Sequence, residues 1–185
     1  MLQLRELRQH EMTVEEYLDS NIEGRTELLG GIIYDVAARY EPHRYAVRKL
    51  SRALSQRLSD IGDRVGVPVI LQPQDAVAVP HWKGKDAPEI DIAVIADRFY
   101  EPIATSADGF AFIEVSHTTY ESDRGYKIPL YVAAGVPSWI VNISERWVEF
   151  YGSPADLELP NGRVSGDTFE VLGVPITVAS LLGPA

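Results

Sequence analysis

The sequence has no cysteine among its 185 residues and no long uninterrupted apolar run. Without cysteine there is no disulfide and no thiolate zinc site, which suits a protein of a reducing cytoplasm. A membrane-spanning helix needs about 18 consecutive apolar residues, and the N-terminal segment lacks the apolar stretch of a secretory signal. We therefore expect a cytoplasmic protein with no membrane partner.

Positive charge is scarce as well. The chain carries 17 Lys and Arg against 27 Asp and Glu, which gives a net charge of -10. Since non-specific binding to nucleic acid usually needs a basic face, this composition argues against a simple DNA-coating protein. A nucleic-acid partner would have to be bound through a local basic patch or through metal ions. The length and the 45% hydrophobic content fit one domain, 1–185, with a substantial core.

Helical patterns occur at four places. Thr13 and Glu16 form a capping-box pattern, which predicts a short first helix. Apolar residues at three- and four-residue spacing predict a longer amphipathic helix over 42–61. In a third helix, expected over 122–134, Gly125 and Pro129 make the first turns irregular. The expected helices cover residues 13–20, 42–61, 122–134 and a short stretch near 178–182.

Strand patterns alternate with these helices. Val- and Ile-rich runs predict strands over 67–79, 87–95 and 110–116. Hairpin signals occur at Gly30-Gly31, between 138–143 and 147–151, and at Asn161-Gly162. The sequence therefore predicts an α/β fold with a central mixed β-sheet flanked by helices.

Two of the predicted strands carry acidic residues where a buried strand should be apolar. APEIDIAVI (87–95) contains Glu89 and Asp91, and FAFIEVS (110–116) contains Glu114. An unpaired buried carboxylate is costly unless its pKa shifts or a cation compensates it. If the two strands are neighbours, Asp91 and Glu114 can point into one pocket near the sheet edge.

A divalent cation is one way to compensate two such carboxylates. Mg²⁺ and Mn²⁺ prefer hard oxygen ligands, typically one or two carboxylates with water in the remaining positions. The backbone carbonyl of Val115 is a further candidate ligand. Lys127 begins the next helical segment, from which its ammonium could orient a water or stabilise charge on a phosphate.

A series of short motifs resembles the PD-(D/E)XK nuclease superfamily and, more specifically, the Uma family of restriction-endonuclease-like proteins. The similarity in order and spacing covers roughly residues 12 to 182, and the last block is its most specific part. In this chain the motifs are Arg25-Thr26-Glu27-Leu28-Leu29-Gly30-Gly31, His43, Pro88-Glu89-Ile90-Asp91, Glu114-Val115-Ser116, and KIPLYVAAGVPSWIVN from Lys127 to Asn142.

The resemblance implies a restriction-endonuclease-like fold and metal-dependent hydrolysis of phosphodiester bonds in nucleic acid, with DNA as the expected partner. The residues it implies as catalytic are Asp91, Glu114, Lys127, Glu27 and His43. Asp91, Glu114 and Glu27 would hold Mg²⁺ or Mn²⁺. Ser116 stands where the superfamily usually has lysine, so Lys127 would take that role from the helix.

Several single residues have a structural interpretation beside the functional one. Glu89 could be a second metal ligand, but the favoured interpretation places it at a solvated strand end. Glu27 could pair with Arg25 or with a cation of the first helix, and His43 could be a capping or partly buried histidine. Further expectations are a site-facing His117, core positions for Tyr131 and Trp139, surface positions for His10 and His81, and a solvated or phosphate-contacting face made of Arg44, Arg48, Lys49, Arg52 and Arg57.

Two other functions stay open. One is a non-catalytic binding or adaptor module that keeps the nuclease fold. A homodimer is expected, since the hairpin with Trp147, Phe150 and Tyr151 suits an interface. The other is a hydrolase of small nucleotide substrates, which fits the acidic composition better than a DNA substrate does.

Overall fold

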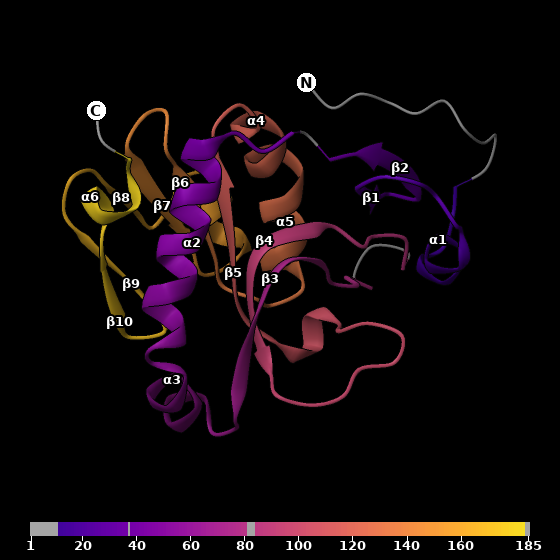
Figure 1. Ribbon diagram of the computed structural model, residues 1–185, viewed down its shortest axis with the longest axis horizontal. Helices are drawn as coiled ribbons and strands as arrows, with labels where there is room; N and C mark the ends of the chain where they lie inside the picture. The colour runs from indigo at the N-terminus through magenta and orange to yellow at the C-terminus, as the bar shows by residue number, and fades with distance from the viewer. Residues whose placement is uncertain (1–10, 37, 81–83, 184–185) are drawn as a thin grey trace.

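The computed structural model describes residues 11–36, 38–80 and 84–183 (Figure 1). His10 and His81, both expected on the surface, lie outside the described residues. No helix in these ranges is long and apolar enough to cross a membrane. The α-helices are α1 (Val14–Asp19), α2 (Glu41–Ser55), α3 (Leu58–Val65), α4 (Tyr120–Ser122), α5 (Ile128–Ala133) and α6 (Val178–Leu181). The shorter elements are two 3₁₀ turns, η1 (Ser106–Asp108) and η3 (Pro154–Leu157), and a π-helical turn, η2 (Asp123–Lys127).

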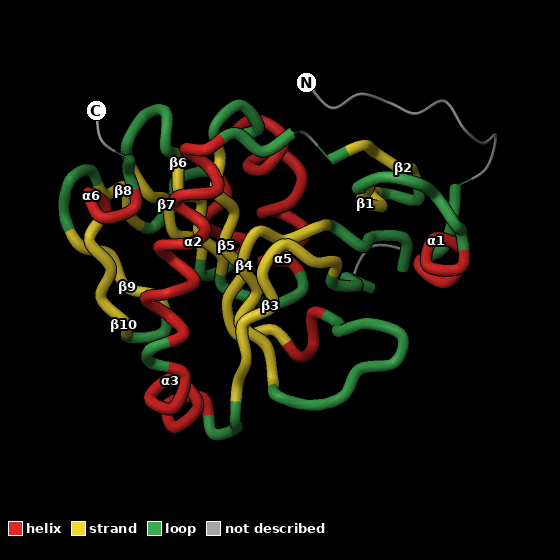
Figure 2. The backbone as a smooth tube through the Cα atoms, viewed as in Figure 1, coloured by secondary structure: helices red, strands yellow, loops and turns green. Residues whose placement is uncertain are grey.

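A six-stranded mixed sheet lies at the centre of the fold, in the order β3-β4-β5-β6-β7-β8 (Figure 2). Its strands are β3 (Val69–Ala76), β4 (Glu89–Ala96), β5 (Gly109–Ser116), β6 (Ser138–Asn142), β7 (Trp147–Tyr151) and β8 (Gly162–Val164). Only β5 and β6 pair in parallel; the other neighbours are antiparallel. A parallel pair needs a long crossover, and α4, η2 and α5 supply it. The predicted α/β class is confirmed, and the strands expected over 87–95 and 110–116 are neighbours, which is the condition for Asp91 and Glu114 to meet.

Helices cover both faces of this sheet. α2, α3, α6 and the hairpin of β9 (Thr168–Val171) and β10 (Val174–Thr177) pack on one face, and α5 packs on the other (Figure 1). The first apolar cluster includes Leu50, Leu54, Ile92, Ile113, Trp139 and Phe169, and the second includes Ile90, Phe112, Ile128, Tyr131 and Ile140. Tyr131 and Trp139 are therefore core residues, as predicted.

The N-terminal hairpin is tied to the start of β4. β1 (Thr26–Leu29) and β2 (Ile32–Asp35) meet at Gly30 and Gly31, whose φ angles of 58° and 82° are those of the tight turn that the Gly-Gly pair predicts. The backbone of Leu28 exchanges hydrogen bonds of 3.2 and 2.8 Å with Ala87. These bonds hold the hairpin, and with it Glu27, beside the first residues of β4.

The single helix predicted over 42–61 is wrong, because the structure has two helices there. Arg57 has φ -128° and ψ 16°, which breaks the segment into α2 and α3, and α3 runs past Gly62 to end at Gly66 in the left-handed region. Gly62 lies inside α3, and the Val67 carbonyl oxygen lies 3.0 Å from the place that a Cβ would occupy, so a larger residue would be crowded there. The apolar spacing continues across the break, so the pattern does not reveal it.

The predicted hairpin at Asn161-Gly162 is also wrong. Gly162 begins β8, which pairs with β7 after the loop that contains η3. The C-terminal hairpin turns instead at Leu172-Gly173, where both residues have positive φ, 49° and 77°. The other predicted hairpin, between β6 and β7, is confirmed.

Candidate active site

A pocket of about 360 Å³ opens beside the ends of β4 and β5. The hairpin β1–β2, the start of α2, and the α4–η2 segment contribute its walls. The residues that line it are Glu27, Asp35, Val36, Ala38, Arg39, Tyr40, His43, Glu89, Asp91, Glu114, His117, Thr118, Thr119, Ser122, Asp123 and Lys127. It therefore contains all five residues predicted as catalytic, together with His117.

Strand register brings Asp91 and Glu114 together. Ile92 of β4 pairs with Ile113 of β5 in an antiparallel ladder, so the next positions outward are Asp91 and Glu114. The two residues are 9% and 2% exposed. The Val115 N–H donates a 2.9 Å hydrogen bond to Asp91 Oδ2, which fixes the Asp91 carboxylate against β5.

His43 is the side-chain partner of Asp91. From the first turn of α2, its Nε2 lies 3.1 Å from both Asp91 oxygens, while its Nδ1 is buried without a hydrogen-bond partner. Burial opposes the ionisation of Asp91, but the hydrogen bond and charge of His43 hold the Asp91 pKa below its usual value. Asp91 is thus kept as a carboxylate in a buried place. His43 therefore lines the pocket and contacts Asp91, and it does more than cap the start of α2.

Glu114 lies in a different environment. Tyr131, from α5, donates a 2.6 Å hydrogen bond to Glu114 Oε1, and the Lys127 Nζ is 3.5 Å from the same oxygen. Burial raises the pKa of Glu114 well above its usual value, and the charge of Lys127 offsets this only in part. Two adjacent carboxyl groups therefore differ in how readily they lose a proton.

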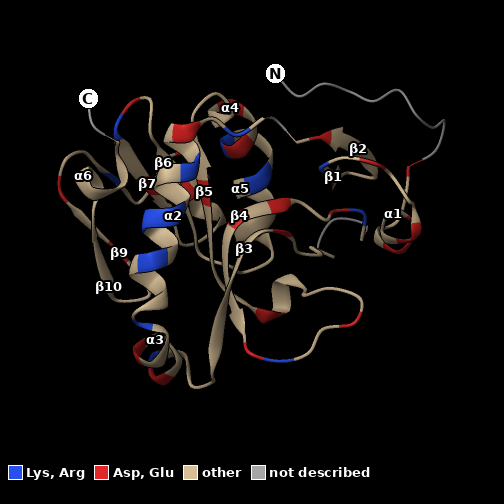
Figure 3. Cartoon of the chain, in the orientation of Figure 1, with Lys and Arg blue, Asp and Glu red and all other residues tan. Residues whose placement is uncertain are grey.

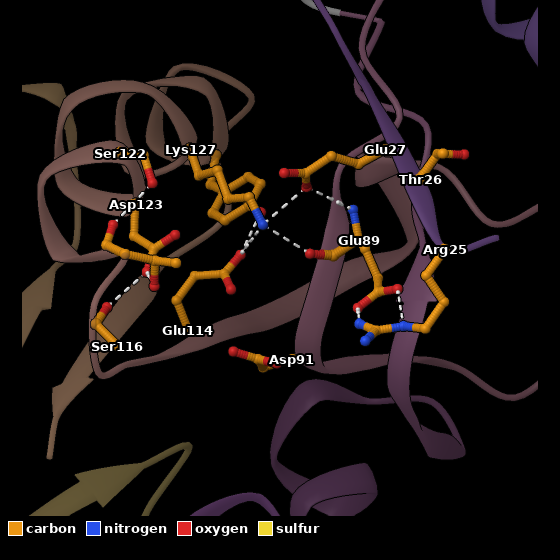
Figure 4. Close-up of polar contacts among 12 residues, drawn as sticks. Arg25, Thr26, Glu27, Glu89, Asp91, Glu114, Ser116, Ser122, Asp123 and Lys127 are labelled. Atoms are coloured by element: carbon orange, nitrogen blue, oxygen red, sulfur yellow. Dashed lines mark hydrogen bonds and ion pairs between the residues drawn. The ribbon is translucent and has the colours of Figure 1, made fainter. Parts of the chain in front are cut away.

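The Lys127 ammonium contacts residues of three strands, β1, β4 and β5 (Figure 4). Its ammonium lies 2.9 Å from Glu27 Oε2 and 3.5 Å from Glu114 Oε1, and it donates a 2.8 Å hydrogen bond to the backbone carbonyl of Glu89. Burial alone would lower the pKa of Lys127, but Glu114 and Glu27 raise it. The ammonium thus stays charged and compensates the carboxylates. Glu27 pairs with this lysine and not with Arg25.

Glu89 does not lie at a solvated strand end as expected. Its side chain is only 11% exposed and forms ion pairs with both Arg25 and Arg39. Arg25 uses two nitrogens, with Nη2 2.5 Å from Oε1 and Nε 3.2 Å from Oε2. The expectation failed because Arg39 is fifty residues away in sequence and meets Glu89 only in the fold.

The π-helical turn η2 presents a further buried acid that sequence reasoning missed. Asp123 accepts hydrogen bonds from Ser116 Oγ at 2.6 Å and Thr119 Oγ1 at 2.7 Å. Burial raises the Asp123 pKa, although Lys127 and these two hydroxyls oppose the shift. Ser116 is thus occupied in holding η2. The spacing of Asp123 and Lys127, four residues apart, was the available signal, because that spacing places side chains on one helix face.

The basic cluster of the second predicted helix lies outside this pocket. Figure 3 shows the basic bands along α2. Arg48 pairs with Glu41, and Arg57 pairs with Asp60, at the surface. All five members, Arg44, Arg48, Lys49, Arg52 and Arg57, are exposed.

The donor chemistry of the pocket fits a hard divalent cation. Among the described residues, no three His, Asp or Glu side chains form a ready-made metal cluster. Mg²⁺, however, usually takes one or two protein carboxylates and keeps several waters. Asp91 and Glu114 supply such a pair, buried beside each other, with His43 and Lys127 as the groups that compensate them here.

The raised pKa of Glu114 predicts how stability depends on pH without metal. The folded state holds the Glu114 proton more tightly than the unfolded state, so this group's contribution is complete at low pH. It is lost as pH rises through the raised pKa. We expect Glu114→Gln to become increasingly more stable than wild type as pH rises above about 4.3, the ordinary Glu value. Urea denaturation in EDTA measures this difference, and a gap that shrinks with rising pH would contradict it.

Comparison with known proteins places this chain in a family. A protein-family model, described as "Uma2: Putative restriction endonuclease", matches residues 14–179. The fold is similar to the crystal structure of a putative nuclease belonging to DUF820 from Anabaena variabilis ATCC 29413, with a TM-score of 0.65 and 13% identity. That similarity covers 92% of this chain and 97% of the other. No curated protein matches the chain.

Proposed function

Because the Uma2 model matches residues 14–179, the chain belongs to the Uma2 family, and we propose that it is a metal-dependent endonuclease acting on DNA. The observation that carries this proposal is the buried pair Asp91 and Glu114. They lie opposite each other on neighbouring strands, beside the charged Lys127. In this proposal residues 1–185 act as one nuclease-like domain.

Asp91 and Glu114 would hold the cation, which is Mg²⁺ or Mn²⁺. When bound, it would supply a more acidic water and would neutralise charge on the phosphate. Glu114 would hold the cation in its ionised form, which burial disfavours in the absence of a metal. Glu27, a third expected ligand, is better explained as the partner that holds Lys127, since their 2.9 Å contact is shorter than the one to Glu114.

Neighbouring groups orient these two carboxylates. His43 and the Val115 N–H fix both oxygens of Asp91, and Tyr131 fixes Glu114. Lys127 stays protonated, so it is not a general base; it acts as a fixed positive charge beside the reacting phosphate. Rigid placement of charges in a water-poor site is the main way in which such sites lower a barrier.

A substrate panel tests the proposal. Wild type should cut DNA in the presence of Mg²⁺ or Mn²⁺ and should lose that activity in EDTA. The panel includes supercoiled plasmid, linear duplex, single-stranded DNA, RNA and mononucleotides. Hydrolysis of mononucleotides alone would identify the small-substrate hydrolase, and binding without hydrolysis of any of them would identify the adaptor module.

The expected homodimer stays a prediction. The aromatic residues expected at the interface make contacts within the chain itself. Phe150 packs on Trp139, Trp147 packs against Tyr120, and Tyr151 is buried. Light scattering of the purified protein, with and without duplex DNA, measures the oligomeric state.

A further inference from the structure

A pocket that receives a polyanion needs positive groups, and this one has few. Among the described residues that line it, Arg39 and Lys127 are the only Lys or Arg side chains. They face six carboxyl groups from Glu27, Asp35, Glu89, Asp91, Glu114 and Asp123. A metal ion would offset part of this charge. Contact with a substrate phosphate still requires a donor from the chain itself.

Lys127 already has three acceptors close to its ammonium. It donates a 2.8 Å hydrogen bond to the Glu89 carbonyl, and it forms ion pairs with Glu27 at 2.9 Å and Glu114 at 3.5 Å. Withdrawing it would leave two buried carboxylates uncompensated. Lys127 therefore acts on the substrate by its charge and not by a direct hydrogen bond.

Arg39, in contrast, has donors that can reach a substrate. Its side chain is 16% exposed, lines the pocket, and forms an ion pair with Glu89. A guanidinium has five N–H donors in a planar fork, the geometry that matches a phosphate as well as a carboxylate. Glu89 is held independently by two nitrogens of Arg25. If Arg39 were to take another anion, Glu89 would keep a bidentate partner.

We infer that Arg39 binds a phosphodiester group of the substrate at the pocket mouth, and that the Glu89 carboxylate occupies this position when substrate is absent. The inference rests on the proposed function for the class of its substrate. Glu89 is then a competitor of the substrate phosphate. Arg25 keeps that competitor attached to the start of β4 when the phosphate arrives.

Two variants with opposite effects test this inference. The probe is a fluorescein-labelled DNA oligonucleotide, followed by anisotropy in EDTA so that no cleavage occurs. Arg39→Gln should weaken binding at least about tenfold, because it removes a charge-assisted hydrogen bond to phosphate, and should lower the salt dependence by about one phosphate contact. Glu89→Gln should tighten binding several-fold, because it removes the competing carboxylate.

The matched controls are Arg57→Gln and Asp60→Asn. These residues form an exposed ion pair at the α2–α3 junction, and neither lines the pocket. They change the net charge by the same amounts as the two test variants. Their effects on binding should be much smaller, and effects of equal size would overturn the inference in favour of a general charge effect.

Other outcomes separate this inference from the proposed function. Weakening by both Arg39→Gln and Glu89→Gln would mean that the ion pair is only structural, and would overturn the inference. If Arg39→Gln does not fold, Arg39→Lys keeps the charge without the fork and should show intermediate binding; wild-type binding would count against the inference. Cleavage by wild type with unchanged binding in the variants would leave the nuclease proposal intact. If Arg39→Gln weakens and Glu89→Gln tightens DNA binding but wild type cleaves no substrate, the phosphate site is supported and the nuclease proposal is contradicted.

Discussion

Lys127→Met is expected to destabilise the metal-free protein by about 3–5 kcal/mol, the usual cost of removing one partner from a buried ion pair. Lys127 is 8% exposed and compensates Glu27 and Glu114, which are 3% and 2% exposed. Methionine fills most of the same volume, so loss of packing contributes little. The carboxyl groups of Glu27 and Glu114 must then either stay charged while buried or take up protons.

Chemical denaturation at several pH values distinguishes this cause from a packing defect. Without Lys127, the pKa of Glu114 rises further, so the folded variant gains stability relative to wild type as pH falls. Adding Glu27→Gln to Lys127→Met should restore part of the loss, because it removes one uncompensated charge. A loss below about 1 kcal/mol, typical of a surface ion pair, would show that the lysine is not a structural charge.

Asp91→Asn is expected to lower kcat/KM at least about a hundredfold while leaving the fold intact, because a cation held here is worth several kcal/mol of transition-state stabilisation. Asparagine keeps the shape and an oxygen that can accept the Val115 N–H. Its neutral amide, however, is a poor ligand for a divalent cation in place of a carboxylate. Stability should change by about 1 kcal/mol, the ordinary net value of a hydrogen bond.

Asp156→Asn is the matched control for this variant. Asp156 is also 9% exposed and accepts hydrogen bonds from the Gly152 and Ser153 N–H groups, both at 2.9 Å. It does not line the pocket. This variant should keep wild-type activity, so that a loss confined to Asp91→Asn reports the site. Full activity of Asp91→Asn would remove Asp91 from the mechanism.

The interrupted strands carried most of what the sequence could predict about the site. Asp91 and Glu114 each break an otherwise apolar run, and a chain rarely buries such groups without a partner. Their strands proved to be neighbours, and Lys127 came from the crossover helix that a parallel pair requires. Local patterns reach this far because each depends on residues close together in sequence.

The parts that could not be predicted depend on contacts between distant segments. Glu89 begins β4, a position that is often solvated, and only the fold brings Arg39 against it. Tyr131 fits the core pattern, yet its hydroxyl is directed at Glu114. The break at Arg57 leaves the apolar spacing unchanged, so no periodicity could detect it.

Calorimetric titration with Mn²⁺ is the most direct test of the central claim that Asp91 and Glu114 share a divalent cation. Wild type and Asp156→Asn should bind the ion with equal affinity, and Asp91→Asn should show no binding. The titration is repeated with a DNA oligonucleotide present, because substrate phosphates often complete the coordination of such cations. Binding to Asp91→Asn as tight as to wild type, or no binding to wild type under either condition, would contradict the claim.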